Sequence, residues 1–199
     1  MSAQEEPLCV ENSPERRGEI GCSIIENKPL PGNLKEPLFW HIDRFGTGER
    51  ARAAVVPASI AFDAHGAWWL MSIESQTERH HGGQHVTEVK PLPLPEAHKY
   101  SMVVISAYIP SGLTSRVHLH SGVEAFYVVD GEPCLETADR AFKMQKGETL
   151  VVPTGVPMRL VATGSKPRRA LAVIVYDASK PPTTRMGMET AWQLVSCTK

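Results

Sequence analysis

The chain has 199 residues, enough to bury one sizeable hydrophobic core, so we expect a single domain with extensions. Its 21 basic and 22 acidic residues nearly balance, and no basic run is interleaved with aromatic residues, which argues against a nucleic-acid-binding protein. The apolar stretches are shorter than the roughly 20 residues that span a bilayer, and the acidic start lacks a signal-peptide pattern, so we expect a cytoplasmic protein without membrane contact.

The first segment of the chain, residues 1–37, contains five prolines separated by charged residues and shows no sustained helical period. This composition predicts an extended, partly disordered N-terminal arm. Two apolar stretches, residues 20–25 and 37–42, have the character of strands or anchors. They allow the arm to dock on the domain or across a subunit interface.

From about residue 53 onward, short apolar segments alternate with turn residues, which is typical of an all-β sandwich or barrel. We expect the barrel domain to span residues 38–180, with a C-terminal tail over residues 181–199. Only residues 95–99 and the tail around residues 189–194 are compatible with a helical turn. The ten candidate strands are 53–63, 67–74, 84–90, 100–109, 115–120, 124–130, 133–138, 148–152, 157–163 and 169–177.

Three tryptophans are candidates for a dimer interface. Trp68 and Trp69 are adjacent, so on a strand one faces the core and the other faces outward. Aromatic residues are enriched at protein interfaces. We therefore expect a homodimer, with Trp40 and the Trp68–Trp69 pair at its interface.

The four cysteines are Cys9, Cys22, Cys134 and Cys197, and none lies in a Cys-x-x-Cys pattern. This spacing argues against a zinc ribbon or a dense disulfide framework. Reduced thiols are the expected state, although an even number of cysteines also permits one or two disulfides.

Two groups of histidines are candidate metal ligands. His80, His81 and His85 lie among glycines and charged residues, a context that favours an exposed loop over a functional metal site. His118 and His120 differ, because residues two apart on a strand point to the same face.

Glu124 follows this histidine pair after a Ser-Gly-Val segment that can form a tight turn. The next residues read as a returning strand, so the carboxylate would face both imidazoles. Imidazole and carboxylate together suit several divalent first-row metal ions. We therefore predict one divalent metal ion bound by His118, His120 and Glu124, the alternative being a polar hairpin without metal.

The glycines around these residues complete a longer pattern. Residues 112–131 read as glycine, five residues, His-x-His, three residues, glutamate, six residues and glycine. Residues 147–158 read as glycine, five residues, proline, one residue, glycine, two residues and methionine. The two segments resemble the paired motifs of the cupin superfamily. The resemblance implies a cupin-type double-stranded β-helix, or jelly-roll, barrel, and a single motif pair implies a monocupin.

Met158 stands where the resemblance implies a third histidine, the fourth metal ligand of the family. A thioether is a weak ligand for most divalent ions but a reasonable one for Cu(I), and methionine also fills irregular apolar gaps. We expect Met158 to line the pocket. The remaining His₂Glu set is that of non-haem Fe(II) oxygenases and of catalytic zinc sites; among Fe, Mn, Zn, Ni and Cu it does not identify the metal.

Strand alternation also predicts the wall of the pocket. Arg116 shares the face of the candidate histidines and is a candidate for holding a substrate carboxylate, the alternative being a solvated charge at the end of a strand. The other wall residues are apolar, so few polar groups would orient a ligand. The expected pocket-lining residues are Arg116, Phe126, Val128, Met158 and Leu160.

Three functional classes follow. The first is a metal-dependent enzyme, a dioxygenase or isomerase of a small organic molecule, in which the metal acts as Lewis acid or oxygen activator. The second is a non-catalytic binding protein or sensor for a small ligand, and the third is a metal-independent epimerase-like cupin. The fold does not choose among them, because the chemistry resides in the site. Nucleophilic hydrolysis has little support, since no serine lies in a Gly-x-Ser-x-Gly context.

Overall fold

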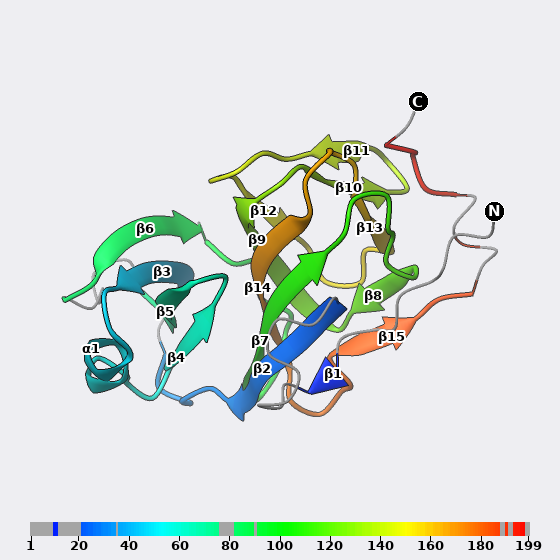
Figure 1. Ribbon diagram of the computed structural model, residues 1–199. Coiled ribbons are helices and arrows are strands. Elements are labelled where there is room, and N and C mark those ends of the chain that lie inside the picture. The colour runs from blue at the N-terminus through cyan, green and yellow to red at the C-terminus, as the bar shows by residue number, and fades with distance from the viewer. Residues whose placement is uncertain are drawn as a thin grey trace.

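A computed structural model describes residues 10–11, 21–34, 36–75, 82–89, 91–187, 190 and 193–197. In this part of the chain the strands form three sheets, two of which build a barrel while the third lies beside it (Figure 1). No helix in the described ranges combines the length and the apolar composition needed to span a bilayer.

Two sheets form the walls of the barrel, and their strand pairings are antiparallel except for the short parallel pairing of β1 with β2. The six-stranded sheet contains, in spatial order, β1 (Val10–Glu11), β2 (Gly21–Pro29), β7 (Tyr100–Ile109), β14 (Arg168–Asp177), β9 (Gly122–Asp130) and β12 (Thr149–Val152). The five-stranded sheet contains β11 (Ala141–Lys143), β10 (Pro133–Thr137), β13 (Met158–Ala162), β8 (His118–His120) and β15 (Thr183–Arg185).

Apolar side chains from both sheets meet inside the barrel. Val103 and Phe126 come from the six-stranded sheet, and Leu135, Met158 and Leu160 come from the five-stranded sheet. Two antiparallel sheets around one core make a jelly roll. This arrangement confirms the predicted all-β, double-stranded β-helix fold.

The third sheet contains, in spatial order, β4 (Ser59–Ala64), β5 (Ala67–Glu74), β3 (Phe39–Phe45) and β6 (Gln84–Val89). It lies beside the six-stranded sheet, to the left of the barrel in Figure 1. Its residues fall within the expected barrel domain, 38–180, but they belong to neither barrel sheet. A separate sheet with one apolar face produces the same pattern of short apolar segments as added barrel strands, so the sequence pattern does not distinguish them.

The central strand β14 is apolar on both faces because both are covered. Leu171 and Val173 pack in a core shared with the third sheet, while Ala172 and Ile174 belong to the barrel interior. A strand buried on both sides lacks the alternation of apolar and polar residues that a half-exposed strand shows. The six-stranded sheet is therefore the middle layer of the molecule.

The tryptophans expected at a dimer interface pack against other residues of the same chain. Trp40, 0% exposed, and Trp69 pack in the core between the third sheet and the barrel. Trp68 lies on the opposite face, where the Arg52 guanidinium carbon is 4.9 Å from its ring centroid. The two adjacent rings do face opposite ways, but Trp40 and Trp69 have no surface to offer a partner.

One short helix lies between β3 and the β4–β5 hairpin of the third sheet. The helix α1 (Gly48–Ala53) is capped at its N-terminus by Thr47, whose hydroxyl accepts a hydrogen bond from the Arg50 amide at 3.3 Å. The predicted strand over 53–63 is therefore wrong at its start, since β4 begins only at Ser59. Six residues are too few to reveal a helical period. Residues 95–99 form no helical turn. In the tail, Thr190 is helical and the Gln193 amide donates a 3.1 Å hydrogen bond to the Thr190 carbonyl oxygen, while residues 189, 191 and 192 lie outside the described residues.

The N-terminal arm contributes a strand to the barrel. Strand β2 pairs antiparallel with β7, with Cys22 opposite Ala107, which confirms a strand in the apolar segment at 20–25. The backbone groups of β7 are satisfied on both sides in this way. Most of the predicted arm before Gly21 lies outside the described residues.

The prediction of reduced thiols is wrong. Cys134 and Cys197 form a disulfide across a sequence separation of 63 residues, and Cys22 is also disulfide-bonded. The backbone amide of Cys197 donates a 2.8 Å hydrogen bond to the Glu136 carboxylate, so the C-terminal segment is fastened to β10 beside the disulfide. Such a pairing depends on which distant segments meet, which cysteine spacing does not reveal.

Candidate metal centre

The corner between β8 and β9 brings the three candidate ligands together. Ser121 alone separates the two strands, so the chain passes directly from the five-stranded sheet to the six-stranded sheet. A Cβ at Gly122 would clash with the Val175 carbonyl oxygen, so only glycine allows this close approach. His118 and His120 consequently lie on one wall and Glu124 on the other.

The ligand atoms of His118, His120 and Glu124 all lie within 4.8 Å of one another, and all three side chains are buried. The two imidazole centroids are 5.0 Å apart. His120 Nε2 and Glu124 Oε2 are 3.0 Å apart, and apart from this contact neither atom has a hydrogen-bond partner among the described residues. Buried polar atoms without partners are costly. A cation held between them would remove that cost, so the donor set fits a metal ion.

Hydrogen bonds behind the imidazoles determine which ring nitrogen faces this centre. His118 Nδ1 lies 2.7 Å from the Arg116 carbonyl oxygen, and His120 Nδ1 lies 3.0 Å from the Pro182 carbonyl oxygen. A carbonyl oxygen only accepts, so each Nδ1 carries the proton and each Nε2 keeps its lone pair. The Thr183 hydroxyl is also 3.0 Å from His120 Nδ1. Metal-binding histidines are typically oriented by such contacts.

The electrostatics of the two histidines differ. Burial, together with the positive charge of a protonated His120, lowers the pKa of His118, and Arg168 acts in the same direction. Burial also disfavours the charged form of His120, but the Glu124 carboxylate outweighs it and raises the pKa of His120. A metal ion would therefore bind His118 in its neutral form near pH 7, whereas any proton on His120 Nε2 would have to leave before a metal ion could bind there.

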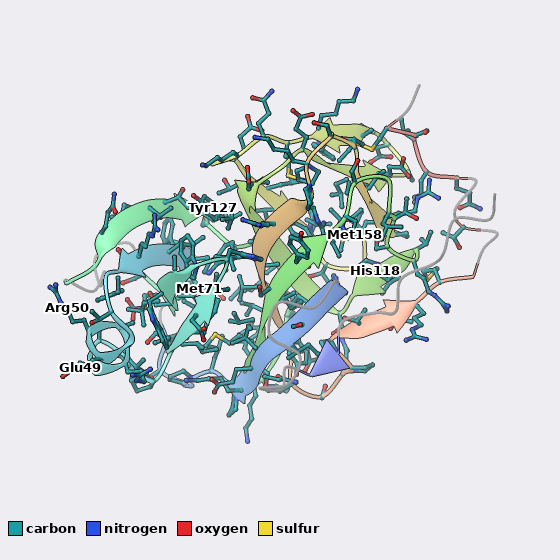
Figure 2. The ribbon with its side chains drawn as sticks, in the orientation of Figure 1. Glu49, Arg50, Met71, His118, Tyr127 and Met158 are labelled. Carbon is teal, nitrogen blue, oxygen red and sulfur yellow. A yellow bond between two sulfur atoms is a disulfide. The ribbon has the colours of Figure 1, made fainter. Side chains whose placement is uncertain are left out.

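Met158 lies opposite His118 in the pairing of β13 with β8, and both are labelled on the barrel in Figure 2. Cross-strand partners point to the same face of a sheet, so the methionine points into the barrel. It is 1% exposed and belongs to the apolar cluster of the barrel rather than to the cavity wall. Val128 also belongs to this apolar cluster rather than to the cavity wall.

A cavity of about 320 Å³ extends from the three ligands into the barrel. Of the predicted wall residues, Arg116, Phe126 and Leu160 line it. The wall also contains residues that sequence reasoning missed, because they come from β2, β14, β15 and the segment before β15, which lie outside the two motifs. These additional lining residues include Cys22, Ile24, Arg168, Pro182, Thr183 and Arg185.

The second group of histidines does not join this centre. His80 and His81 lie outside the described residues. His85 is on β6, where its Nδ1 is 3.5 Å from Asp43 Oδ1 in the third sheet. Among the described residues, His118, His120 and Glu124 are the group whose ligand atoms converge closely enough for one ion.

The family model of the cupin domain matches residues 104–174, the segment from β7 through β14 that carries the candidate ligands. The barrel of this chain belongs to the cupin superfamily. No curated protein sequence matches the chain significantly.

Solved structures of proteins with different activities are similar to part of this chain. A polyketide cyclase from Streptomyces resistomycificus is 21% identical, with a TM-score of 0.37, over 45% of this chain and 61% of the cyclase. A salicylate 1,2-dioxygenase from Pseudoaminobacter salicylatoxidans, in complex with gentisate, is 22% identical, with a TM-score of 0.39, over 44% of this chain and 24% of that chain. A cupin-like protein from Thermotoga maritima is 16% identical, with a TM-score of 0.39, over 47% of this chain and 69% of that chain.

Proposed function

We propose that this cupin is a metal-dependent enzyme of the dioxygenase or isomerase type that acts on a small organic molecule inside the barrel. One observation carries the proposal: the buried ligand atoms of His118, His120 and Glu124 converge at the wall of a cavity. The bonds from each Nδ1 to a backbone carbonyl leave both Nε2 lone pairs available, as ligation requires.

Three protein ligands leave coordination positions open, which distinguishes catalytic sites from closed structural ones. When bound, a divalent ion such as Fe, Mn, Zn, Ni or Cu would supply Lewis acidity or oxygen activation. The protein's own part is to orient the imidazoles and to exclude water with an apolar wall, to which Ile105, Phe126 and Ile174 contribute. Because Met158 packs in the core, we assign it no ligand role.

Elemental analysis of protein purified without an affinity tag tests the metal. We expect about one divalent ion per chain, lost when both His118 and His120 are replaced by alanine. His98→Ala is the matched control, because His98 is exposed and far from the centre in sequence. Full metal content in the double variant would disprove the assignment.

Turnover separates the enzyme from the alternative of a non-catalytic binding protein or sensor. Oxygen consumption by the iron-loaded protein in the presence of small organic acids would support the dioxygenase type. A metal-loaded protein that binds a ligand and returns it unchanged would support the binding protein. Turnover by the metal-free protein would support the epimerase-like alternative.

A homodimer and a cytoplasmic location, both expected from the sequence, stay predictions. Among the described residues, Val55 and Val195 are the large apolar side chains with high exposure, so the structure offers no aromatic patch in support of the dimer. Disulfides persist mainly in oxidising compartments, so the Cys134–Cys197 bond counts against the cytoplasm. Light scattering tests the first expectation, and thiol labelling of the protein in fresh cell extract tests the second.

A further inference from the structure

We propose that the ligand of the cavity has a bulky apolar body, about the size of two fused rings, which lies against Ala107, Ala170 and Ala172. These three residues are called the alanine hollow below. The inference rests on the proposed function, since it names the substrate class of the same cavity. It excludes sugars and other fully polar molecules as substrates.

The interior of the barrel is filled in one part and empty in another. Val128, Leu135 and Met158 pack in its apolar core and do not line the cavity. The cavity of about 320 Å³ lies instead against β7 and β14, whose alternate residues form much of its wall. Protein interiors are close-packed and contain few voids larger than a water molecule. A void of this volume inside the barrel is therefore a binding space rather than a packing defect.

Small side chains on the two central strands create this space. On β14, Ala170 and Ala172 line the cavity, whereas Leu171 and Val173, on the opposite face, fill the core shared with the third sheet. Ala170 is paired with Ala107 on β7, so two small side chains lie next to each other. Larger apolar residues at these positions would bury more area and stabilise the fold. The strands thus carry small residues on the face where a ligand would otherwise have no room.

The wall around the alanine hollow is apolar. Ile105 and Ile109 flank Ala107 at alternate positions of β7, and Phe126 on β9 is paired with Ala172. Such groups form no hydrogen bonds, so a polar ligand body would lose its water without replacement. An apolar body gains free energy from the burial of its surface. Water is a poor occupant as well, since cavities lined by such side chains stay dry.

The polar groups of the cavity gather at the candidate metal centre. Glu124 Oε2 faces His120 Nε2 at 3.0 Å, and the positive charge of Arg168 contributes to the lowered pKa of His118. Arg185 is paired with His118 across β15 and β8. A polar group of the ligand therefore finds its partners at this centre, and the alanine hollow holds the apolar remainder.

The alanine hollow begins beside the metal centre. In the pairing of β14 with β9, Ile174 lies opposite Glu124, and Ala172 lies opposite Phe126. Two residues of a strand span about 7 Å. Ala172 is thus one such step along the wall from the partner of a metal ligand, so a body bound there lies next to the site of the proposed reaction.

The volume of the cavity indicates the size of the body. A cavity of roughly 150 Å³ lined by Leu, Ile and Phe side chains binds one benzene molecule. The cavity of this protein, at about 320 Å³, is about twice as large. It matches two fused rings or a folded chain of similar volume.

Calorimetric titration of the chelator-treated protein with three alcohols tests the inference. Naphthylmethanol has a body of the expected size, benzyl alcohol has a single ring, and quinoxalinylmethanol has the shape of naphthylmethanol but polar nitrogens in its rings. We expect naphthylmethanol to bind at least about tenfold more tightly than either of the others. Its binding should show the negative heat-capacity change that marks apolar burial. Equal affinity for naphthylmethanol and quinoxalinylmethanol would overturn the inference.

The variant Ala107→Leu should weaken the binding of naphthylmethanol by at least about tenfold, because leucine occupies part of the alanine hollow. Ala178→Leu is the matched control, since Ala178 is exposed, follows the end of β14 and does not line the cavity. A folded Ala107→Leu variant with wild-type affinity would overturn the inference. If leucine prevents folding, the preference of the wild-type protein among the three alcohols still decides.

Addition of zinc separates this inference from the proposed function. Naphthylmethanol that binds only after addition of zinc is held by the metal, which overturns the inference and leaves the metal centre standing. Preferential binding of naphthylmethanol by a protein that takes up no zinc supports the inference and removes the proposed function.

Discussion

His120 Nε2 lies 3.0 Å from Glu124 Oε2, and apart from this contact neither atom has a hydrogen-bond partner among the described residues. The two groups face a common point from opposite walls of the barrel, and a proton on His120 or a metal ion satisfies both. Their placement connects the stability of the protein to metal binding, because a ligand that binds only the folded state stabilises it.

Zinc should stabilise the wild-type protein and leave the Glu124→Gln variant nearly unaffected. At a free zinc concentration of 100 times the dissociation constant, the expected stabilisation is about 2.7 kcal/mol. Glutamine keeps the volume of the side chain but removes the charge that pairs with the ion. Urea unfolding with zinc and with chelator measures the difference, and an equal gain in both proteins would contradict the assignment of Glu124.

Met158 should prove replaceable by leucine. Since it packs in the barrel core, Met158→Leu should change stability by less than about 1.5 kcal/mol and leave metal content unchanged. Met158→His should raise metal affinity by adding a ligand beside His118. Metal content and unfolding free energy check both variants. A large loss of metal from Met158→Leu would show that the sulfur is a ligand and would indicate copper.

Thr183 should act as a positioning residue for His120. Thr183→Val removes the hydroxyl 3.0 Å from Nδ1 but leaves the Pro182 carbonyl in place. We expect metal affinity to fall by about tenfold, the lower end of the range for such contacts. Competition with a chelator measures it. Thr184→Val is the control, because Thr184 is exposed and pairs with Leu119. An equal loss of metal affinity in the control would mean that disturbance of β15, and not the lost hydroxyl of Thr183, causes the effect.

Acid should destabilise the metal-free protein partly through His65. Burial lowers the pKa of His65 from 6.5, although its contact with the Ala170 carbonyl opposes the shift. The unfolded chain therefore binds more protons in the interval below pH 6.5, so stability is complete above this value and falls as the pH drops through the folded-state pKa. Burial lowers the pKa of His41 in the same direction.

His65→Asn should reduce this acid-induced loss without distorting the turn, because asparagine tolerates the positive φ of 53° at this position. The measurement is the difference in unfolding free energy between pH 7.5 and pH 5.5, compared between variant and wild type with chelator present. An undiminished difference would mean that His65 does not contribute to it.

Local spacing was sufficient to predict the candidate metal ligands. His118, His120 and Glu124 lie within seven residues around the corner between β8 and β9, so alternation along a strand and one sharp change of direction bring them together. The same local patterns predicted an all-β chain. They did not show that β3 to β6 form a sheet of their own, because an apolar strand face looks the same whichever sheet it covers.

Beyond Arg116, Phe126 and Leu160, the cavity wall was decided by tertiary structure. Arg168 and Thr183 reach it from β14 and β15, and Cys134 meets Cys197 only because the C-terminal segment returns to β10. These contacts depend on the order of strands within a sheet and on how two sheets close around a core. Neither is encoded in the alternation of nearby residues, since the free energy that selects them comes from burying side chains that are distant in sequence.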